Sequence, residues 1–252
     1  MLLDGKEIYR GYDEYGPVLV IDDGTKRYLS FGEGDEQSCW LKSEPHLPQL
    51  DYIRAMCLVL LLTEPKRIIS LGLGAGTLNS CLHFHFPESV QQIVELRREV
   101  IDVAHRYFQL PRGKRIQTHH MDAKSYLDCI ESKPADIIFS DIYDENGVDE
   151  QQHDPAYLHE CYERLKPKGW LVLNCWKEHK GETLLTELAG LFDDIRTCTT
   201  QEGNWIVFAG KQRDTQSQKQ LKQQAKLLSQ TLGFALSPYL NRMNLLNQPH
   251  LL

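Results

Sequence analysis

The sequence predicts an α/β protein built on a mostly parallel sheet with helices on both faces. Between residues 65 and 210, strand-like apolar runs alternate with helix-like segments, which is the pattern of repeated βα units. The first of these runs breaks into three glycines at alternate positions, in the stretch "ISLGLGAGT" at 69–77. The last two runs are separated by only a short turn, so a closing hairpin should insert an antiparallel last strand.

The first forty residues are predicted to form a small antiparallel cap. Two β-rich runs flank the turn residues "DDGT" at 22–25, which is a good hairpin signal. We do not expect this cap to have a core of its own. An apolar helix is predicted next, over 49–62, and Glu64–Pro65 should end it.

The remaining elements follow in regular order. The predicted strands are 67–71, 89–96, 115–121, 135–140, 170–176, 194–200 and 204–210, and the helices are 76–84, 98–108, 123–130, 155–165 and 182–191. Five βα units with a closing β hairpin are the layout of the class I methyltransferase fold, a Rossmann-like seven-stranded sheet whose last strand is antiparallel. The expected division is a β hairpin region (1–48), a Rossmann-like nucleoside-binding catalytic domain (49–210) and a helical tail (211–252).

The tail after Gly210 is predicted to dock on that domain as a helix. One helical face is apolar and consists of Leu221, Ala225, Leu228 and Leu232. The opposite face carries a basic stripe of Lys219, Lys222 and Lys226. We interpret this stripe as a solvated outer face, and contact with an acidic partner is the alternative.

Composition excludes several classes of function. The net charge of -7 would repel a phosphate backbone, so nucleic acid is not expected as a partner. The seven cysteines are scattered and contain no CxxC pair, which is typical of a reducing cytoplasm. The longest apolar run, 55–62, is too short to span a bilayer, and the first residues lack the pattern of a signal peptide. The histidines have no metal-ligand spacing, so we expect a soluble cytoplasmic protein without a metal.

Acidic residues at successive strand ends indicate a nucleoside site. Gly72, Gly74 and Gly76 stand between a strand and a helix, where bare backbone can approach a ligand. Glu95 ends the second strand of the series and can accept both ribose hydroxyls, and Asp122 ends the third, where it can accept from an adenine amino group. Each acid alone is also consistent with helix capping. Together, on one edge of a sheet, they favour adenosyl binding.

Several motifs resemble the spermidine synthase family of aminopropyltransferases, especially its bacterial spermidine-synthase-like members. The matching stretches are "LGLGAGTL", "IVELRREVIDVAHRYFQLP", "MDAKSYL", "DIIFSDIYDENG" and "AYLHECYERLKPKGWLVLN". The resemblance implies that Glu95 binds the ribose and that Asp122 with Ala123 binds the adenine. It also implies that Asp141 helps to deprotonate an attacking amine, that Asp144 holds a polyamine, that Gln37 and Tyr52 line the cleft, and that the protein forms a homodimer.

The loop "SDIYDENG" supports an amine site independently of the resemblance. Asp141 leaves the fourth parallel strand at the same sheet edge as Glu95, where a carboxylate can take a proton from a primary amine. Asp141 and Asp144 with Tyr143 between them also suit a cationic substrate. The alternative is an acid-rich loop whose side chains only bond their own backbone as Asx turns.

Two departures from the family pattern leave the donor open. Ala75 stands where the family carries an acid that binds the aminopropyl ammonium of decarboxylated S-adenosylmethionine, and Ile53 stands where a glutamine is usual. The leading hypothesis is aminopropyl transfer to an amine, which would release methylthioadenosine. The alternatives are methyl transfer from intact S-adenosylmethionine and a nucleoside-binding paralogue without catalysis.

Overall fold

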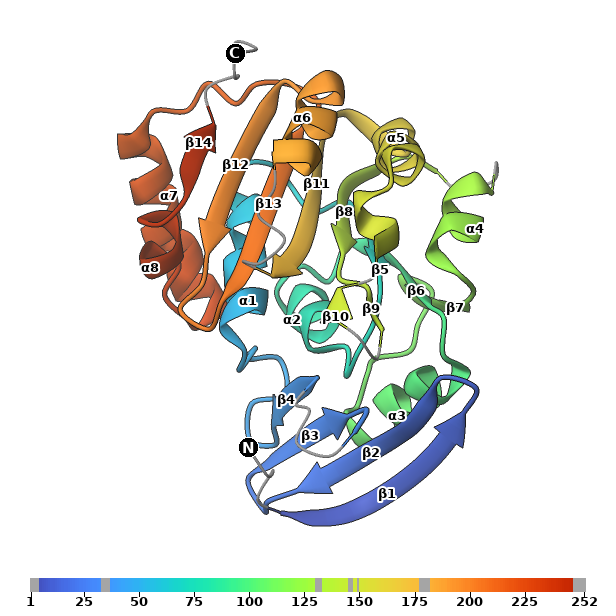
Figure 1. Ribbon diagram of the computed structural model, residues 1–252. Helices are drawn as coiled ribbons and strands as arrows, with labels where there is room; N and C mark the ends of the chain where they lie inside the picture. The colour runs from blue at the N-terminus through green and yellow to red at the C-terminus, as the bar shows by residue number, and fades with distance from the viewer. Residues whose placement is uncertain are drawn as a thin grey trace.

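The computed structural model describes residues 5–32, 37–129, 133–144, 147–148, 150–176 and 182–246. Its main sheet has eight strands in the order β14-β12-β13-β11-β8-β5-β6-β7 (Figure 1). The strands are β5 (Arg67–Leu71), β6 (Val90–Glu95), β7 (Ile116–His120), β8 (Ala135–Ser140), β11 (Leu165–Trp176), β12 (Asp194–Thr199), β13 (Asn204–Gly210) and β14 (Asn244–Leu246). This is the expected α/β fold, with one strand more than the seven that the sequence predicts.

The directions of the central strands match the expectation. Strands β7, β6, β5, β8 and β11 run parallel to one another. Strand β13 lies between β11 and β12 and is antiparallel to both. The additional strand β14 pairs with the edge strand β12, because the tail returns to the sheet after its helices. A three-residue strand has too little periodicity to be predicted from sequence.

Helices cover both faces of this sheet (Figure 1), and its central strands β5, β8, β11 and β13 are rich in buried apolar residues. The helices are α2 (Thr77–His85), α3 (Arg98–Tyr107), α4 (Ala123–Asp128), α5 (Pro155–Glu163), α6 (Glu182–Leu191), α7 (Gln218–Leu232) and α8 (Ser237–Leu240). Alternate side chains enter different cores: Ile68 packs under α2 and α7, whereas Ile69 packs under α4 and α5. No helix within the described ranges is both long and apolar enough to cross a bilayer.

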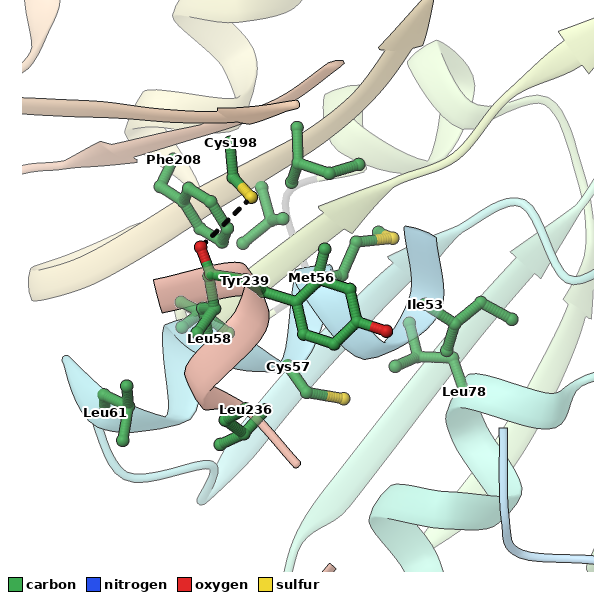
Figure 2. Packing of buried hydrophobic residues seen from close by; sticks show 14 of the residues in the cluster. Ile53, Met56, Cys57, Leu58, Leu61, Leu78, Cys198, Phe208, Leu236 and Tyr239 are labelled. Atoms are coloured by element: carbon green, nitrogen blue, oxygen red, sulfur yellow. Dashed lines mark hydrogen bonds between the residues drawn. The ribbon is translucent and has the colours of Figure 1, made fainter. Parts of the chain in front are cut away.

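The predicted helix over 49–62 is shorter than expected and changes type. It forms α1 (Asp51–Met56) and continues as the 3-10 helix η1 (Cys57–Leu61). Figure 2 shows its side chains packed against Phe208 of β13 and Tyr239 of α8, where the Cys198 thiol donates to the Tyr239 carbonyl oxygen at 3.4 Å. The tail helix α7 docks on the same core through Leu221, Ala225, Leu228 and Leu232, as expected.

The N-terminal region forms a four-stranded antiparallel sheet and not only a hairpin. Its strands are β1 (Lys6–Asp13), β2 (Gly16–Asp22), β3 (Lys26–Ser30) and β4 (Ser38–Leu41), and Figure 1 shows them below the main sheet. Their apolar side chains pack against α3 and the glycine loop, with Val18, Leu29 and Trp40 in one cluster with Val100 and Phe108. The small sheet therefore shares its core with the rest of the protein.

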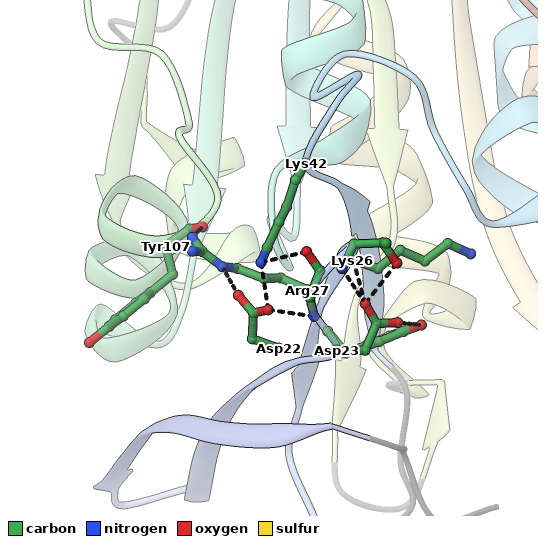
Figure 3. A network of polar contacts seen from close by, with 9 residues as sticks. Asp22, Asp23, Lys26, Arg27, Lys42 and Tyr107 are labelled. Carbon is green, nitrogen blue, oxygen red and sulfur yellow. Dashed lines mark hydrogen bonds and ion pairs between the residues drawn. The ribbon is translucent and has the colours of Figure 1, made fainter.

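Polar contacts also fix this sheet to the end of α3. Arg27 donates to the Tyr107 carbonyl oxygen at 2.7 Å and pairs with Asp22 at 2.8 Å (Figure 3). Lys42 pairs with the same Asp22 carboxylate at 2.5 Å. Hydrogen bonds from Arg27 and Lys42 hold the pKa of Asp22 well below its usual range. The network orients the sheet over the carboxyl ends of the parallel strands.

Candidate active site

A cavity of about 620 Å³ lies at the carboxyl ends of the parallel strands, beside the N-terminal sheet. This is the edge at which open α/β sheets bind ligands. Most of the residues predicted from sequence line it: Gln37, Tyr52, Gly72, Gly74, Glu95, Asp122, Ala123, Asp141 and Tyr143. Gly76 does not line the cavity. Asp144 ends the short strand β9 (Tyr143–Asp144), and its side chain lies outside the described residues.

The glycine loop approaches the neighbouring strand end so closely that a side chain would not fit. Gly72 has a φ of 91°, and a Cβ atom there would overlap the carbonyl oxygen of Asp141. Its N–H donates to the Val94 carbonyl oxygen at 2.8 Å, and the Asp141 N–H donates to that of Leu71 at 2.9 Å. The loop therefore places bare backbone between the ends of β6 and β8, where a ligand can approach it.

Ala75 lies on the side of this loop that faces away from the cavity. It is 1% exposed and packs in the apolar cluster with Trp40, Val100 and Phe108, while its N–H donates to the Ser38 hydroxyl at 3.1 Å. The motif alone suggests that this position faces the donor, and the structure does not agree. In this fold the alanine contributes to docking the N-terminal sheet.

We therefore expect Ala75→Asp to destabilise the protein by about 3–5 kcal/mol, because the new carboxylate would be buried among apolar side chains. Thermal unfolding of Ala75→Asp is compared with that of Ala75→Asn, whose new side chain is similar in size but uncharged. The difference between the two variants gives the effect of the charge apart from that of the added volume. An aspartate variant that is as stable as the asparagine variant and binds decarboxylated S-adenosylmethionine more tightly than wild type would show that residue 75 reaches the cavity.

Glu95 supports the loop from the end of β6. One carboxylate oxygen accepts the N–H of Leu73 at 3.0 Å, and the other accepts the N–H of Arg97 at 2.8 Å. Burial raises the pKa of Glu95, and these two backbone donors oppose that rise. A carboxylate has more acceptor sites than these two hydrogen bonds use, so Glu95 can also accept ribose hydroxyls.

Asp122 has the capping role that the sequence left open, and it also lines the cavity. Its side chain accepts the Ser125 N–H at 2.9 Å and caps the first turn of α4. The adjacent Ala123 is buried at the start of the same helix and lines the cavity beside it. The capping bond holds the carboxylate at the cavity edge, so the two roles are compatible.

Asp141 is held in a fixed orientation just after β8. Its carboxylate accepts the Asn174 side-chain amide at 2.8 Å, and Asn204 donates to Asn174 at 3.1 Å. Tyr52, from the start of α1, also hydrogen-bonds Asp141. Burial raises the pKa of Asp141 to about 6, and the hydrogen bonds from Asn174 and Tyr52 limit the rise. A carboxylate with this pKa can hold and release a proton near neutral pH.

Tyr143 faces the same end of the cavity as Asp141. Its hydroxyl is buried from solvent and lacks a well-formed hydrogen bond within the described part of the chain. Burial, followed by the charge of Asp141, raises the pKa of Tyr143 above its usual range. The hydroxyl lines the cavity, where it can hydrogen-bond a polar ligand.

Asp141→Asn is expected to stabilise the protein, and more at pH 8 than at pH 5. The carboxyl pKa rises from 3.8 to about 6 on folding, so the native state binds this proton more tightly than the unfolded chain. Stability is therefore lost as the pH rises between these values, and above about pH 6 the ionised carboxylate costs on the order of 3 kcal/mol.

Urea unfolding of wild type and variant at the two pH values measures this difference. The control is Asp102→Asn, which removes an exposed carboxylate that pairs with Arg98 on α3. A gain for Asp141→Asn that is no larger at pH 8 than at pH 5 would contradict the elevated pKa.

Several lining residues were not identified from sequence. Asn174 is a buried polar residue within the apolar strand "WLVLNCW", and that contrast is a signal that could have found it. Tyr15 and Glu202 line the cavity from turns that only the tertiary fold brings there. Within the described ranges, no three histidine, cysteine or acidic side chains gather closely enough to hold a metal ion.

The fold and cavity define a class of Rossmann-like proteins that includes spermidine synthases and methyltransferases. Comparison with protein families finds that the spermine/spermidine synthase domain matches residues 51–201. The chain belongs to the spermine/spermidine synthase family.

Individual relatives are named for different activities. The polyamine aminopropyltransferase of Chromobacterium violaceum is 28% identical over 237 residues, which cover 92% of this chain and 90% of that protein. The eEF1A lysine and N-terminal methyltransferase of Bos taurus is 25% identical over 187 residues, or 69% of this chain and 27% of that protein. The crystal structure of a probable spermidine synthase from Corynebacterium glutamicum has a TM-score of 0.76 at 18% identity, covering 98% of this chain and 91% of that one.

Proposed function

We propose that this protein transfers an aminopropyl group from decarboxylated S-adenosylmethionine to an amine. The observation that carries the proposal is the carboxylate of Asp141, which lines the cavity, is oriented by Asn174 and has a pKa of about 6. An amine that is protonated at neutral pH must lose a proton before it can attack. Asp141 is suited to accept that proton.

The charge of the cavity wall supports a cationic donor and a cationic acceptor. Its acidic lining residues are Glu14, Glu95, Asp122, Asp141 and Glu202. Among the described lining residues Arg97 alone is cationic, and it is already paired with Asp13 at 2.8 Å. Intact S-adenosylmethionine would bring a carboxylate into this environment, at a cost of about 1–4 kcal/mol for a like charge 4 Å away.

The other end of the cavity fits an adenosyl group. Glu95 can accept the ribose hydroxyls, Asp122 can accept from the adenine amino group, and the glycine loop lets the backbone approach between them. The position of Asp122 at the N-terminus of α4 and that of Asp141 after β8 separate a nucleoside end from an amine end.

In the proposed reaction the amine nitrogen bonds to the propyl carbon next to the sulfonium. The carbon–sulfur bond breaks, and its electron pair stays on sulfur in methylthioadenosine. Asp141 takes the proton that the amine loses, while Asn174 and Tyr52 keep its carboxylate in line. Tyr143 is placed to hydrogen-bond the acceptor. We also propose that Asp144 binds a second ammonium of the acceptor.

The proposal is tested by incubating the protein with decarboxylated S-adenosylmethionine and a panel of diamines and polyamines. Methylthioadenosine should appear only when an amine is present, together with an equal amount of the aminopropylated amine. Chromatography with mass detection measures both products. Binding of methylthioadenosine without turnover on any amine would instead favour a nucleoside-binding protein that has lost the chemistry.

Methyl transfer from intact S-adenosylmethionine is the second candidate. The similarity to the eEF1A lysine and N-terminal methyltransferase favours it. The two reactions leave different sulfur products, because methyl transfer releases S-adenosylhomocysteine. The same assay with the intact donor therefore distinguishes them.

A further inference from the structure

The turn between β1 and β2 forms one wall of the cavity. Glu14, Tyr15 and Pro17 line it, although they belong to the small N-terminal sheet and not to the nucleoside-binding strands. Tyr15 is 43% exposed. Burial raises the pKa of its hydroxyl, and the carboxylates of Glu14, Asp13 and Asp122 add to the effect. The ring centroid lies 6.0 Å from the guanidinium of Arg97, whose backbone N–H bonds Glu95, so Tyr15 lines the nucleoside end of the cavity.

Arg97 holds this turn by several contacts. Its guanidinium makes two hydrogen bonds to the Asp13 carboxylate, at 2.9 and 2.8 Å, and donates to the carbonyl oxygens of Gly16 at 2.9 Å and Pro17 at 3.3 Å. The same group lies 4.5 Å from the Phe31 ring centroid and 6.0 Å from that of Tyr15. Arg97 is 8% exposed. A bidentate arginine that also caps two carbonyl groups fixes the turn in one conformation.

Arg97 also stands two residues after Glu95, and its backbone N–H donates to the Glu95 carboxylate. One residue thus contacts the acid assigned to the ribose through its backbone and the cavity wall through its side chain. No other described lining residue is cationic.

We propose that Arg97 is a positioning residue that holds Tyr15 as the outer wall of the nucleoside pocket, where the tyrosine ring packs on the adenine. This inference rests on the proposed function, since it requires an adenosyl ligand in the cavity. It assigns Tyr15 a direct contact with the ligand, and it assigns Arg97 the task of keeping that contact in place before the ligand arrives.

Removing these Arg97 contacts should leave the N-terminal sheet docked, because other contacts hold the sheet to α3. The Tyr9 hydroxyl bonds the Glu99 carboxylate, and Arg27 bonds the Tyr107 carbonyl oxygen and lies over the Trp40 ring at 5.6 Å. Arg27 is a matched control. Like Arg97 it makes an ion pair and an aromatic contact, and it ties the sheet to the α3 region by its hydrogen bond to the Tyr107 carbonyl oxygen, but it does not line the cavity.

The experiment measures methylthioadenosine affinity by calorimetry for wild type, Arg97→Met, Arg97→Lys, Tyr15→Ala, the Arg97→Met/Tyr15→Ala double variant and Arg27→Met. Loss of an aromatic contact with a base weakens binding by about 5- to 150-fold, so Tyr15→Ala should fall in this range. Arg97→Met should lose a similar factor, and Arg97→Lys should lose part of it. The double variant should lose no more than the larger single change.

Arg27→Met should keep wild-type affinity even where its thermal midpoint falls as far as that of Arg97→Met. Two results would overturn the proposal: wild-type affinity in Arg97→Met, or losses in the double variant that equal the sum of the single ones. If Arg97→Met does not fold, the affinities of Arg97→Lys and Tyr15→Ala relative to wild type still test the proposal. Absence of binding to the wild-type protein would contradict the proposed function itself, which separates the two failures.

Discussion

Asp141→Asn is expected to reduce turnover by about 10²–10⁴-fold, because the acceptor amine loses the carboxylate that takes its proton. The asparagine keeps the shape of the side chain and an oxygen that can accept from Asn174, so methylthioadenosine affinity should change little. The wild-type rate should rise with pH through about pH 6 as Asp141 ionises, and the variant should lack this step. Steady-state rates across the pH range, with calorimetry on both proteins, measure these effects.

A control for this prediction lies on the same strand. Asp136, at the opposite end of β8, accepts from the Arg67 N–H at 2.7 Å and pairs with Lys166 at 2.8 Å, far from the cavity lining. Asp136→Asn should affect stability and leave the pH dependence of the rate in place. A variant at position 141 that keeps its turnover would show that the carboxylate only shapes the loop.

Glu95→Ala is expected to weaken methylthioadenosine binding by about 150- to 10⁴-fold. Two ribose hydroxyls donate to a charged acceptor in the proposed complex, and each such hydrogen bond contributes about 1.5–3 kcal/mol. The alanine also leaves the N–H groups of Leu73 and Arg97 without their acceptor, so the glycine loop loses its support. Both effects weaken binding of the nucleoside.

Glu95→Gln separates the two contributions. The amide oxygen can still accept one backbone N–H and so retains part of the loop support, but the charge is gone. We expect its affinity to lie between wild type and Glu95→Ala. Asp102→Asn on the neighbouring helix α3 is the control, because it removes an exposed carboxylate that pairs with Arg98. Affinity within error of wild type for Glu95→Ala would remove the ribose assignment.

The fold could be predicted because its signal is local and repeated. Each parallel strand is a short apolar run followed by an amphipathic segment, and the glycine stretch marks the first turn. The carboxyl ends of parallel strands lie on one edge of a sheet, so Glu95, Asp122 and Asp141 were expected on the same edge. The structure brings all three to one cavity. A Cβ atom at position 72 would overlap the Asp141 carbonyl oxygen, which explains why this position is a glycine.

What the sequence did not predict depends on contacts between distant segments. In the sequence, Arg97 is one of several charged residues at the start of a predicted helix, and nothing marks it out. Its partners Asp13, Gly16 and Pro17 come from the β1–β2 turn, which reaches Arg97 only in the folded protein. Ala75 is the converse case, a residue that the sequence assigned to the ligand site and the structure does not. Its position in the motif suggested a ligand contact, whereas its Cβ direction, fixed by the loop, puts it in the apolar cluster with Val100. Strand β14 forms because the tail meets β12.

The central claim is tested most directly by identifying the sulfur product. Purified protein, a mixed set of amines and either decarboxylated or intact S-adenosylmethionine are incubated at pH 8, where Asp141 is ionised, and the nucleosides are separated and weighed by mass spectrometry. We expect amine-dependent methylthioadenosine from the decarboxylated donor and no sulfur product from the intact one. Formation of S-adenosylhomocysteine from the intact donor, with a methylated amine and no methylthioadenosine, would contradict it.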